Sequence, residues 1–562
     1  PTNTADMDAA VQLLQERKEA WVAVPVRARI ALLDRLIADF GAVAERWVAA
    51  GVQAKGLDPR ADVAGEEWAI GPYPVLRNMR LLREALGDIA RTGRPRIPGP
   101  VTTRPDGQVV ARVFPATTAD KVFFTGVSAE VWMQPGVTTA ELPATQATIY
   151  HQPHAGRVAL VLGAGNVSSI GPMDALYKLF VEDQVIVFKT NPVNAYLGPL
   201  MEEAFRAVIE PGYLRVVYGG AAEGAYLCQH PGVEEIHITG SDKTFDAIVF
   251  GGGAEGAARK AARTPLLTKR VTGELGNVSP VIVVPGPWQT SDLSYQAAHL
   301  VSMLVNNAGF NCNATRVIIQ HAAWGQRAPL MGQVRQLLGT LPSRPAYYPG
   351  ARDRQQAFVA AHPDAEQYGD ASGDHLPWTV ISGVDPAAQD DIAFTTEAFC
   401  GLFAETALDA ASVPEFIDRA VAFANDTLWG TLNATILVHP ASLKDRATAA
   451  AVDRAVAGLR FGSVGVNYWA AASYLLGQTT WGGYPGTDIY DIQSGNDVVH
   501  NTLMFARAQK SVVRGPFRAM PVPPFFVTRA HVTGATFRRL SAFEAAPSLG
   551  RALGVVGAAI KR

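Results

Sequence analysis

A cysteine in the stretch Leu304–Ile319, LVNNAGFNCNATRVII, is the residue best placed for covalent chemistry. Cys312 has an asparagine on each side, a glycine three positions before it and an apolar run, Val317 to Ile319, after it. This pattern predicts a turn between a helix and a strand, where a thiolate acts as a nucleophile if its pKa is lowered and a base lies nearby. The alternative is a small buried apolar side chain, which most free cysteines are. One cysteine motif does not decide between the two.

A carboxylate upstream is the candidate base. Glu274 lies within Lys269–Pro280, KRVTGELGNVSP, and we expect it in a short loop that precedes a strand at Val281 to Val284. A carboxylate in this position can take a proton from water if the fold brings it to the thiol.

The two stretches together resemble the aldehyde dehydrogenase superfamily, whose members carry E-L-G-G-x-S-P followed by N-x-G-Q-x-C-x-A. The matching residues are Glu274, Leu275, Gly276, Ser279 and Pro280 in the first segment, and Asn307, Gly309, Cys312 and Ala314 in the second. Three positions depart from the pattern: Asn277 replaces a glycine, Phe310 replaces a glutamine, and Arg316 lies one residue nearer the cysteine than in many members. Further matches extend the resemblance over roughly residues 20 to 510.

Composition supports a folded protein. The chain has 562 residues, of which 48% are hydrophobic and 18% charged, with a net charge of −2. These values favour two or three packed domains and give no reason to expect a nucleic-acid partner. Three cysteines argue against a disulfide framework and fit a cytoplasmic location. No apolar run is long enough to predict a membrane span.

The elements that must position these residues form an α/β pattern. Helices are predicted over residues 7 to 55, and strands at Val109–Phe114, Ala129–Gln134 and Ala147–His151. From Arg157 strands alternate with helices, which predicts a parallel sheet that binds ligands at the carboxyl ends of its strands. The predicted strands are Val158–Leu162, Val185–Lys189, Leu214–Tyr218 and Val233–Thr239, and the predicted helices Pro172–Phe180, Leu197–Val208 and Ala221–Gln229.

Two glycine patterns resemble dinucleotide loops, but each has a simpler interpretation. Gly163–Ser168 follows a strand yet lacks the third glycine, and Gly251–Gly256 follows a stretch better interpreted as a helix end. Gly251 is therefore expected to cap that helix, and residues 251 to 263 to form an insertion.

The family resemblance gives a different cofactor site. It implies Asn166 as an oxyanion donor beside Cys312, with Glu274 as the base. It implies NAD or NADP as cofactor, no metal, and cofactor contacts from Lys189, Gly240, Ser241, Gly276, Glu397 and Phe399. Ser241 is also a plausible helix N-cap. Pro192 stands where many NAD-preferring members carry a glutamate, so NADP stays open.

The same resemblance predicts the domain division. The cofactor domain comprises residues 1–128 and 152–275, the catalytic domain residues 276–485, and an oligomerisation element residues 129–151 and 486–514. A homodimer or homotetramer is expected. Residues 515–562 form an extension beyond the family pattern, with a helix at Leu549–Ile560. The extension is expected to cover a subunit surface or the substrate entrance, and binding to a membrane surface is the alternative.

The implied function is oxidation of an aldehyde to an acid by NAD(P)+ through a Cys312 thioester. Four aromatic residues near the expected entrance favour an apolar or aromatic aldehyde, with packing in the core as the alternative: Phe310, Tyr468, Trp469 and Tyr474. Two alternatives remain: a CoA-acylating relative, against which Glu274 argues, and an inactive binding protein with this fold.

Overall fold

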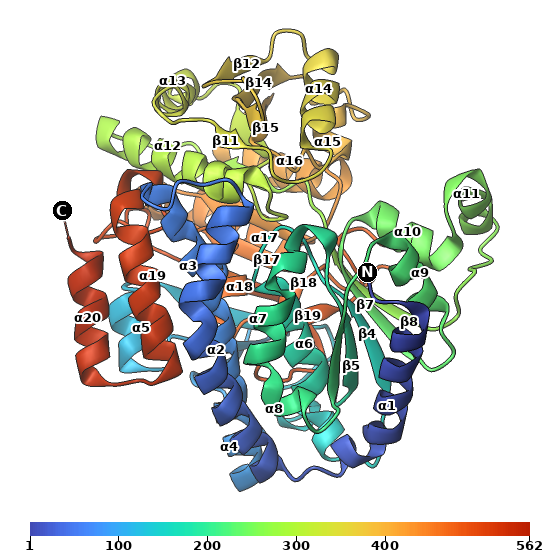
Figure 1. Ribbon diagram of the computed structural model, residues 1–562. Coiled ribbons are helices and arrows are strands. Elements are labelled where there is room, and N and C mark those ends of the chain that lie inside the picture. The colour runs from blue at the N-terminus through green and yellow to red at the C-terminus, as the bar shows by residue number, and fades with distance from the viewer. Residues whose placement is uncertain (562) are drawn as a thin grey trace.

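The computed structural model describes residues 1–561, which form two main β-sheets covered by helices (Figure 1). One sheet has five strands and the other eleven, and two further sheets have two strands each. The predicted α/β class with parallel sheets is confirmed. Every helix within residues 1–561 is too short or too polar to cross a bilayer.

All neighbours in the five-stranded sheet run parallel, in the order β6-β5-β4-β7-β8. Its strands are β4 (Val158–Leu162), β5 (Val185–Lys189), β6 (Leu214–Val217), β7 (Glu235–Gly240) and β8 (Arg270–Leu275). Most of their side chains are apolar and buried, as expected for a parallel sheet covered on both faces. The connecting helices are α6 (Ile170–Phe180), α7 (Gly198–Ala204), α8 (Arg206–Ile209), α9 (Ala221–Gln229), α10 (Asp242–Phe250) and α11 (Gly253–Ala261), with a 3₁₀ turn at Pro192–Leu197.

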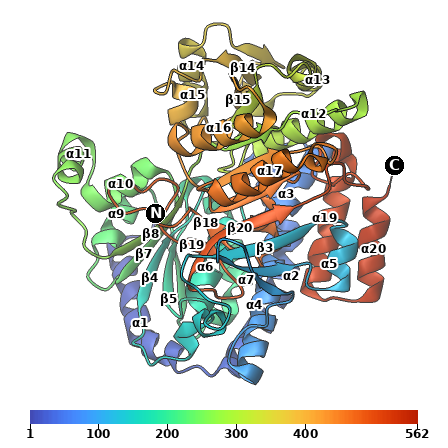
Figure 2. The ribbon, with the colours of Figure 1, turned by 180° about the vertical axis from the view of Figure 1, so that it is seen from behind.

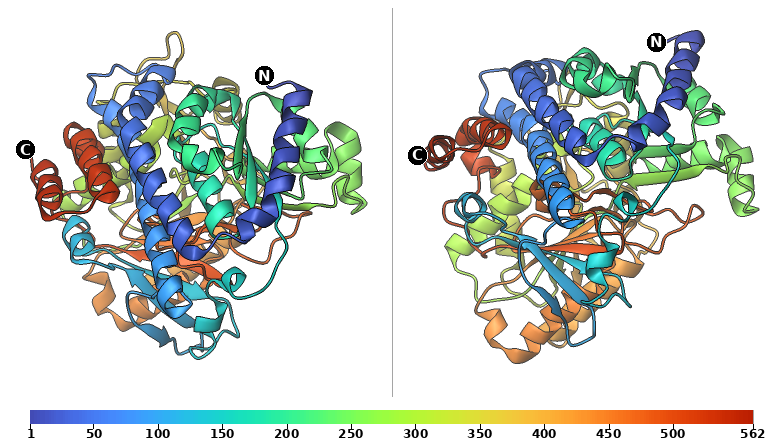
Figure 3. Two further views of the ribbon diagram at one scale, coloured as in Figure 1. Left: turned by 60° about the horizontal axis from the view of Figure 1, so that its bottom comes forward. Right: turned by 90° about the horizontal axis from the view of Figure 1, so that it is seen from below.

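Helices from the N-terminal region pack beside this sheet. They are α1 (Thr4–Val22), α2 (Val26–Ala54), α3 (Glu66–Ile70) and α4 (Pro72–Thr92), with a 3₁₀ turn, η1, at Asp62–Gly65. Helix α1 packs on β4 and β5, and α2 packs on α4 and α7 (Figure 3). The buried apolar residues of α2 recur at helical spacing. The helices predicted over residues 7 to 55 are confirmed.

The eleven-stranded sheet has a parallel centre with antiparallel strands at both edges. Its order is β1-β2-β3-β20-β17-β16-β9-β10-β15-β14-β12, and the strands from β20 to β14 are mutually parallel. Figure 2 shows β3 and β20 side by side, although they are far apart in the sequence. The strands are β1 (Val101–Thr103), β2 (Val109–Phe114), β3 (Ser128–Met133), β9 (Pro280–Val283), β10 (Val317–His321), β12 (Glu366–Tyr368), β14 (Trp378–Val384), β15 (Leu402–Leu408), β16 (Asn433–Leu437), β17 (Ser463–Val466) and β20 (Ala508–Arg514).

The remaining elements connect and cover this second sheet. The helices are α5 (Thr118–Phe123), α12 (Thr290–Val305), α13 (Arg327–Leu338), α14 (Ala351–Ala361), α15 (Ile392–Thr395), α16 (Val413–Asp426), α17 (Arg446–Gly458) and α18 (Ala472–Leu476). The short strands are β11 (Arg344–Pro345) with β13 (His375–Leu376), and β18 (Trp481–Gly482) with β19 (Val498–His500). Further 3₁₀ turns lie at Leu142–Thr145, Thr148–Tyr150, Asn306–Gly309, Ser442–Lys444 and Val527–Arg529.

The C-terminal segment ends in two packed helices, α19 (Ala530–Ala545) and α20 (Leu549–Ala559), at one edge of the molecule (Figure 1). The helix predicted at Leu549–Ile560 is confirmed as α20. Helix α19 was not predicted from the sequence. Its sequence, AHVTGATFRRLSAFEA, contains a glycine and β-branched residues, which are weak helix formers. Packing of Val532, Phe537 and Leu540 into the core supplies the stability that its intrinsic propensity lacks.

Two local predictions are wrong. The stretch Ala147–His151 is a 3₁₀ turn, because Ala147 adopts a φ of 51° that breaks an extended chain. Glu274 lies inside β8 and pairs with Thr239 of β7, because the neighbouring strand supplies the hydrogen bonds that local propensity did not predict.

The glycine at the end of α10 behaves as predicted. Gly251 follows the last helical residue with a φ of 92° and donates its N–H to the carbonyl of Ala247. Strand β1 pairs with β2, and β2 pairs with β3, in the larger sheet. The division of the chain into domains stays a prediction.

Candidate active site

The cysteine lies on a tight loop between α12 and β10. Asn307, Ala308 and Gly309 all have positive φ, between 53° and 80°, which reverses the chain directly after the helix. A side chain at Gly309 would collide with the carbonyl group of Cys400, so only glycine fits there. The loop leaves Cys312 partly exposed among mostly buried neighbours, which confirms the predicted helix–turn–strand context of the thiol.

Arg316 stabilises this loop through hydrogen bonds to its backbone. Its buried guanidinium donates to the carbonyl oxygens of Gly309 at 2.6 Å, Cys400 at 2.6 Å and Leu402 at 3.1 Å. Planar guanidinium groups suit such multiple contacts. The arginine that sequence alone left without a role therefore fixes the backbone around Cys312.

Asn166 reaches the same loop from the end of β4. Its side-chain amide donates to the carbonyl oxygen of Phe310 at 2.9 Å, and its backbone carbonyl accepts from the amide of Asn307 at 3.0 Å. One N–H of the Asn166 amide remains for a ligand, because the NH₂ group carries two hydrogens. The structure thus brings Asn166 and the cysteine loop together.

Glu274 is buried opposite the thiol, with 2% of its surface exposed. Burial raises the pKa of its carboxyl group to about 8, and the nearby charge of Asp174 adds to the rise. Hydrogen bonds with Cys312 and Trp481 lower the pKa of Glu274, but by less than burial raises it. Its Oε1 has no hydrogen-bond partner within residues 1–561. A carboxyl group with a pKa near neutrality is suited to proton transfer.

The thiol itself is not ionised by this environment. Burial, and then the carboxylates of Glu274 and Glu397, raise the pKa of Cys312 well above its usual range. Both effects disfavour the thiolate. A nucleophilic role for Cys312 therefore needs a nearby positive charge or a proton acceptor.

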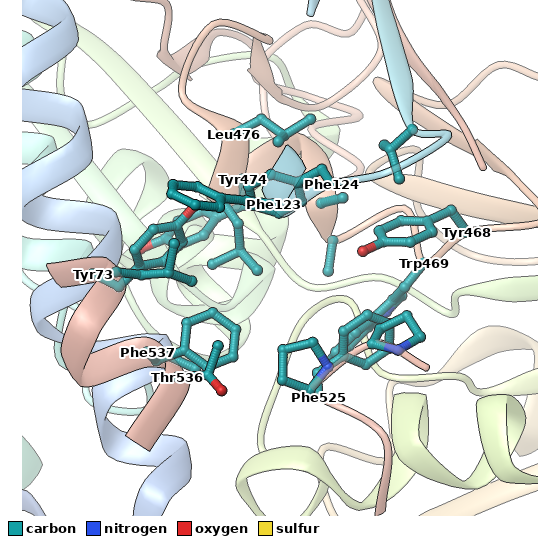
Figure 4. A pocket seen from close by; sticks show the side chains of 18 of the residues that line it. Tyr73, Phe123, Phe124, Tyr468, Trp469, Tyr474, Leu476, Phe525, Thr536 and Phe537 are labelled. Carbon is teal, nitrogen blue, oxygen red and sulfur yellow. The ribbon is translucent and has the colours of Figure 1, made fainter. Parts of the chain in front are cut away.

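Cys312, Glu274 and Asn166 line one cavity of about 340 Å³. Aromatic side chains make up much of its wall, and Figure 4 shows Tyr468, Trp469 and Phe525 facing Tyr73 and Phe537 across the space. Of the aromatics predicted at the entrance, Tyr468, Trp469 and Tyr474 line this cavity. Phe310 packs in the core instead, against the rings of Tyr347, Tyr348 and Phe399.

The other predicted site residues gather at the carboxyl edge of the five-stranded sheet. Lys189 ends β5, Gly240 ends β7, and Gly276 follows the last residue of β8. Gly240 pairs with Leu275, which places it beside Gly276. Ser241 is the N-cap of α10 and accepts from the N–H of Thr244 at 3.1 Å, so the N-cap interpretation is confirmed.

Glu397 and Phe399 approach this edge from the larger sheet. The Glu397 carboxylate accepts from the backbone N–H of Asn277 at 3.1 Å, and a side chain at Gly276 would collide with it. Burial raises the pKa of Glu397 to about 7. Phe399 adopts a φ of 42°, and its ring lies 5.0 Å from that of Tyr348. These contacts join the two sheets at the site.

Sequence comparison identifies relatives for part of the chain. A sequence model described as the aldehyde dehydrogenase family matches residues 116–335. Aminoacetaldehyde dehydrogenase of Pseudomonas aeruginosa is 30% identical over 267 residues, which cover 44% of this chain and 48% of that protein. Human 4-trimethylaminobutyraldehyde dehydrogenase is 34% identical over 139 residues, 24% of each chain. The chain therefore spans less than half the length of these curated relatives.

Solved structures match a larger part of the chain. A mutant aldehyde dehydrogenase from Pseudomonas syringae, solved with NAD+ and octanal, has a TM-score of 0.60 at 20% identity, covering 91% of this chain and 89% of that one. An NADP-dependent glyceraldehyde-3-phosphate dehydrogenase from Bacillus halodurans, solved with NADP, has a TM-score of 0.59 at 17% identity, covering 91% of each chain. This likeness establishes the fold. The family match over residues 116–335, the curated relatives and the shared fold together support membership of the aldehyde dehydrogenase superfamily.

The residues that support the cysteine loop from a distance were not predicted from the sequence. Asn307 accepts hydrogen bonds through its Oδ1 from Lys55 at 2.9 Å and from the Tyr347 hydroxyl at 2.9 Å. Lys55 also forms a buried ion pair with Glu67 at 2.7 Å. Lys55 lies 252 positions before Asn307. No local pattern links two such residues, so only the fold reveals the contact.

Proposed function

We propose that the protein oxidises an aldehyde to the carboxylic acid with NAD(P)+ as hydride acceptor. The observation that carries this proposal is the convergence of a thiol, a carboxyl group with a raised pKa and an amide donor on one mostly apolar cavity. These three groups match the needs of a nucleophile, a general base and an oxyanion donor.

In the first step the Cys312 sulfur attacks the aldehyde carbon and forms a thiohemiacetal. The free N–H of the Asn166 side chain, with a backbone N–H near Cys312, stabilises the developing oxyanion. The Asn166 contact to the Phe310 carbonyl fixes the amide before the substrate arrives. Hydride loss from the former aldehyde carbon then leaves a thioester on Cys312.

Hydrolysis of the thioester is the role proposed for Glu274. Its carboxylate takes a proton from water, the resulting hydroxide attacks the thioester carbonyl, and the acid and the Cys312 thiol are released. Burial keeps Glu274 basic enough for this transfer near neutral pH. Water as acyl acceptor distinguishes this mechanism from acyl transfer to CoA.

The residues at the sheet edge fit a dinucleotide. Lys189 is 6% exposed, and its ammonium has no carboxylate within salt-bridge distance in the described part of the chain. Burial lowers the pKa of this ammonium, and the charge of Glu223 acts in the opposite direction. The ammonium can donate hydrogen bonds to ribose hydroxyl groups. Gly240 and Ser241 directly precede α10, and the free N–H groups at the start of this helix favour a phosphate group. The Glu397 carboxylate can accept a hydrogen bond from a ribose hydroxyl group of the cofactor. Bound NAD(P)+ supplies a hydride acceptor and a positive charge, and a positive charge favours the ionised thiol.

The choice between NAD and NADP and the oligomeric state belong to the same proposal. Pro192 opens the 3₁₀ turn after β5 and offers no carboxylate to repel a 2′-phosphate. We therefore expect NADP to be accepted as well as NAD. We also expect a homodimer or homotetramer, which light scattering of the purified protein tests.

The test of the proposed function is nicotinamide reduction, followed by absorbance, with several aldehydes, each cofactor, and CoA present or absent. We expect turnover without CoA in the wild type and a loss of at least about 10³-fold in Cys312→Ala, because removal of a nucleophile removes the covalent route. Cys228→Ala, at a buried cysteine that does not line the cavity, is the matched control and should keep activity. Turnover that requires CoA would contradict the role of Glu274, and turnover in Cys312→Ala would contradict that of the thiol.

A further inference from the structure

The C-terminal segment beyond the family pattern is built into the fold. Glu544 of α19 is 1% exposed and forms ion pairs with Arg77 at 2.7 Å and with Arg80, both on α4. Buried charges persist only where they are paired in this way. A side chain at Gly65 would lie 2.6 Å from the Cα of Gly534, so η1 and α19 meet backbone to backbone. The segment therefore holds a fixed position beside α4.

This segment forms one wall of the cavity in front of Cys312. The residues come from three parts of it: Ala519–Phe525, one face of α19 and one face of α20. Figure 4 shows Thr536 and Phe537 of α19 on the side opposite Tyr468 and Trp469. Val556 and Ala559 of α20 continue the same wall. The substrate space is therefore a channel closed in part by residues that the family pattern does not include.

The channel contains a single charged side chain among its lining residues. That residue is Glu274, to which the mechanism assigns the base. The remaining lining residues are aliphatic, aromatic or neutral polar. Two buried hydroxyls in the wall, those of Tyr73 and Thr536, have no hydrogen-bond partner within residues 1–561, and both are neutral. No lining residue could neutralise a carboxylate or a phosphate on the substrate.

The outer end of the channel is also apolar. Val122 of α5, Met520 and Ile560 line the cavity, yet they are 51%, 72% and 60% exposed. Exposed apolar side chains that gather at one cavity are typical of a ligand-binding groove. They border the opening through which a substrate passes from solvent to Cys312.

We propose that residues 519–560 form the specificity wall of the substrate channel and select neutral, apolar aldehydes that extend from Cys312 to α19 and α20. The inference rests on the proposed function and adds the substrate class to it. An unpaired charge is strongly disfavoured in this channel, whereas each buried methylene group strengthens binding about fourfold. Aromatic faces compensate the lost hydration of a cationic group only in part. Chain length and neutrality therefore determine affinity.

A substrate series that varies chain length and charge tests the class. Propanal, hexanal and octanal are compared with succinic semialdehyde and 4-trimethylaminobutyraldehyde, by kcat/KM of the wild type. We expect kcat/KM to rise from propanal to octanal and to be at least about 100-fold higher for octanal than for either charged aldehyde. A preference for a charged aldehyde, or equal values along the series, would overturn the proposal.

Variants of α20 test the wall itself. Val556→Trp and Ala559→Phe add volume on the channel side, and Leu553→Trp adds it on the solvent side of the same helix, where Leu553 is 64% exposed. We expect the two wall variants to raise KM for octanal about tenfold or more and to leave propanal within about twofold, because only the longer chain reaches α20. Leu553→Trp should leave both substrates unchanged. Equal effects of the wall and control variants on octanal would overturn the proposal.

The two proposals fail in different ways. Cys312-dependent oxidation of propanal, with octanal insensitive to the wall variants, would leave the dehydrogenase intact and refute the specificity wall. If no aldehyde is oxidised, calorimetric binding of 1-octanol to Cys312→Ala tests the wall alone. Binding that Val556→Trp weakens by about tenfold, but Leu553→Trp does not, would support the wall, and absence of binding would refute it.

Discussion

Two buried carboxyl groups, those of Asp174 and Glu274, have very different pKa values. Burial alone would raise the pKa of Asp174, but the imidazoles of His237 and His500, each 3.6 Å away through Nε2, lower it to about 2. Glu274 lacks such partners, and burial raises its pKa to about 8. Such a pair is typical of sites that hold one carboxylate permanently charged and use the other for proton transfer.

This difference predicts the pH dependence of Asp174→Asn. The ionised form of Glu274 is the base, so kcat should rise with pH through the Glu274 pKa. Removal of the Asp174 charge lowers that pKa, and the rise should then occur at lower pH. Thr239→Val, which removes the 2.9 Å hydrogen bond to Asp174 but keeps the charge, is the control and should shift the profile less. An unchanged or upward-shifted profile in Asp174→Asn would contradict the assignment of Glu274.

At the scale of elements, α19 connects the C-terminal segment to the N-terminal helices. The ion pairs of Glu544 with Arg77 and Arg80 are buried, and Arg77 also pairs with Asp120 at 3.0 Å. On the outer face of the same helix, Arg538 pairs with Glu45 at 2.6 Å, with both side chains about 60% exposed. The ion pairs of Glu544 and the pair of Arg538 with Glu45 have similar N–O distances, but only the first are buried. Their contributions to the free energy of unfolding should therefore differ.

Glu544→Gln should therefore destabilise the protein far more than Glu45→Gln. Loss of one partner in a buried pair costs about 3–5 kcal/mol because the remaining charge stays buried, whereas an exposed pair contributes about 1 kcal/mol or less. Thermal unfolding followed by circular dichroism measures both variants. Similar melting temperatures for the two variants would contradict the docking of α19 described above.

The three residues that the sequence proposed as catalytic line one cavity, whereas the segments around them were predicted less well. Cys312 and Glu274 were proposed from local motifs that resemble the family, and Asn166 from the family resemblance alone. Helix α19 and the Lys55–Asn307 contact were not predicted, because tertiary packing and long-range pairing determine them. Glu274 was assigned to a loop for the same reason, since β7 completes its strand.

At the scale of the whole molecule, the site lies where two sheets and the C-terminal segment meet. The five-stranded sheet contributes Asn166 and Glu274, the larger sheet positions Cys312 and Glu397, and α19 and α20 complete the channel. Each part supplies a different requirement of the proposed reaction: a hydride-acceptor site, a nucleophile and an apolar substrate channel. The proposed reaction therefore depends most on a covalent intermediate at Cys312.

Intact-mass spectrometry of Glu274→Gln, mixed with octanal and each nicotinamide cofactor, tests that claim most directly. Glutamine cannot take a proton from water, so we predict that the protein accumulates one octanoyl group, that peptide mapping places it on Cys312, and that wild type accumulates far less. Cys312→Ala in the same mixture should gain no acyl mass. An unmodified Glu274→Gln protein that still turns over at the wild-type rate, or an acyl group on another residue, would contradict the mechanism.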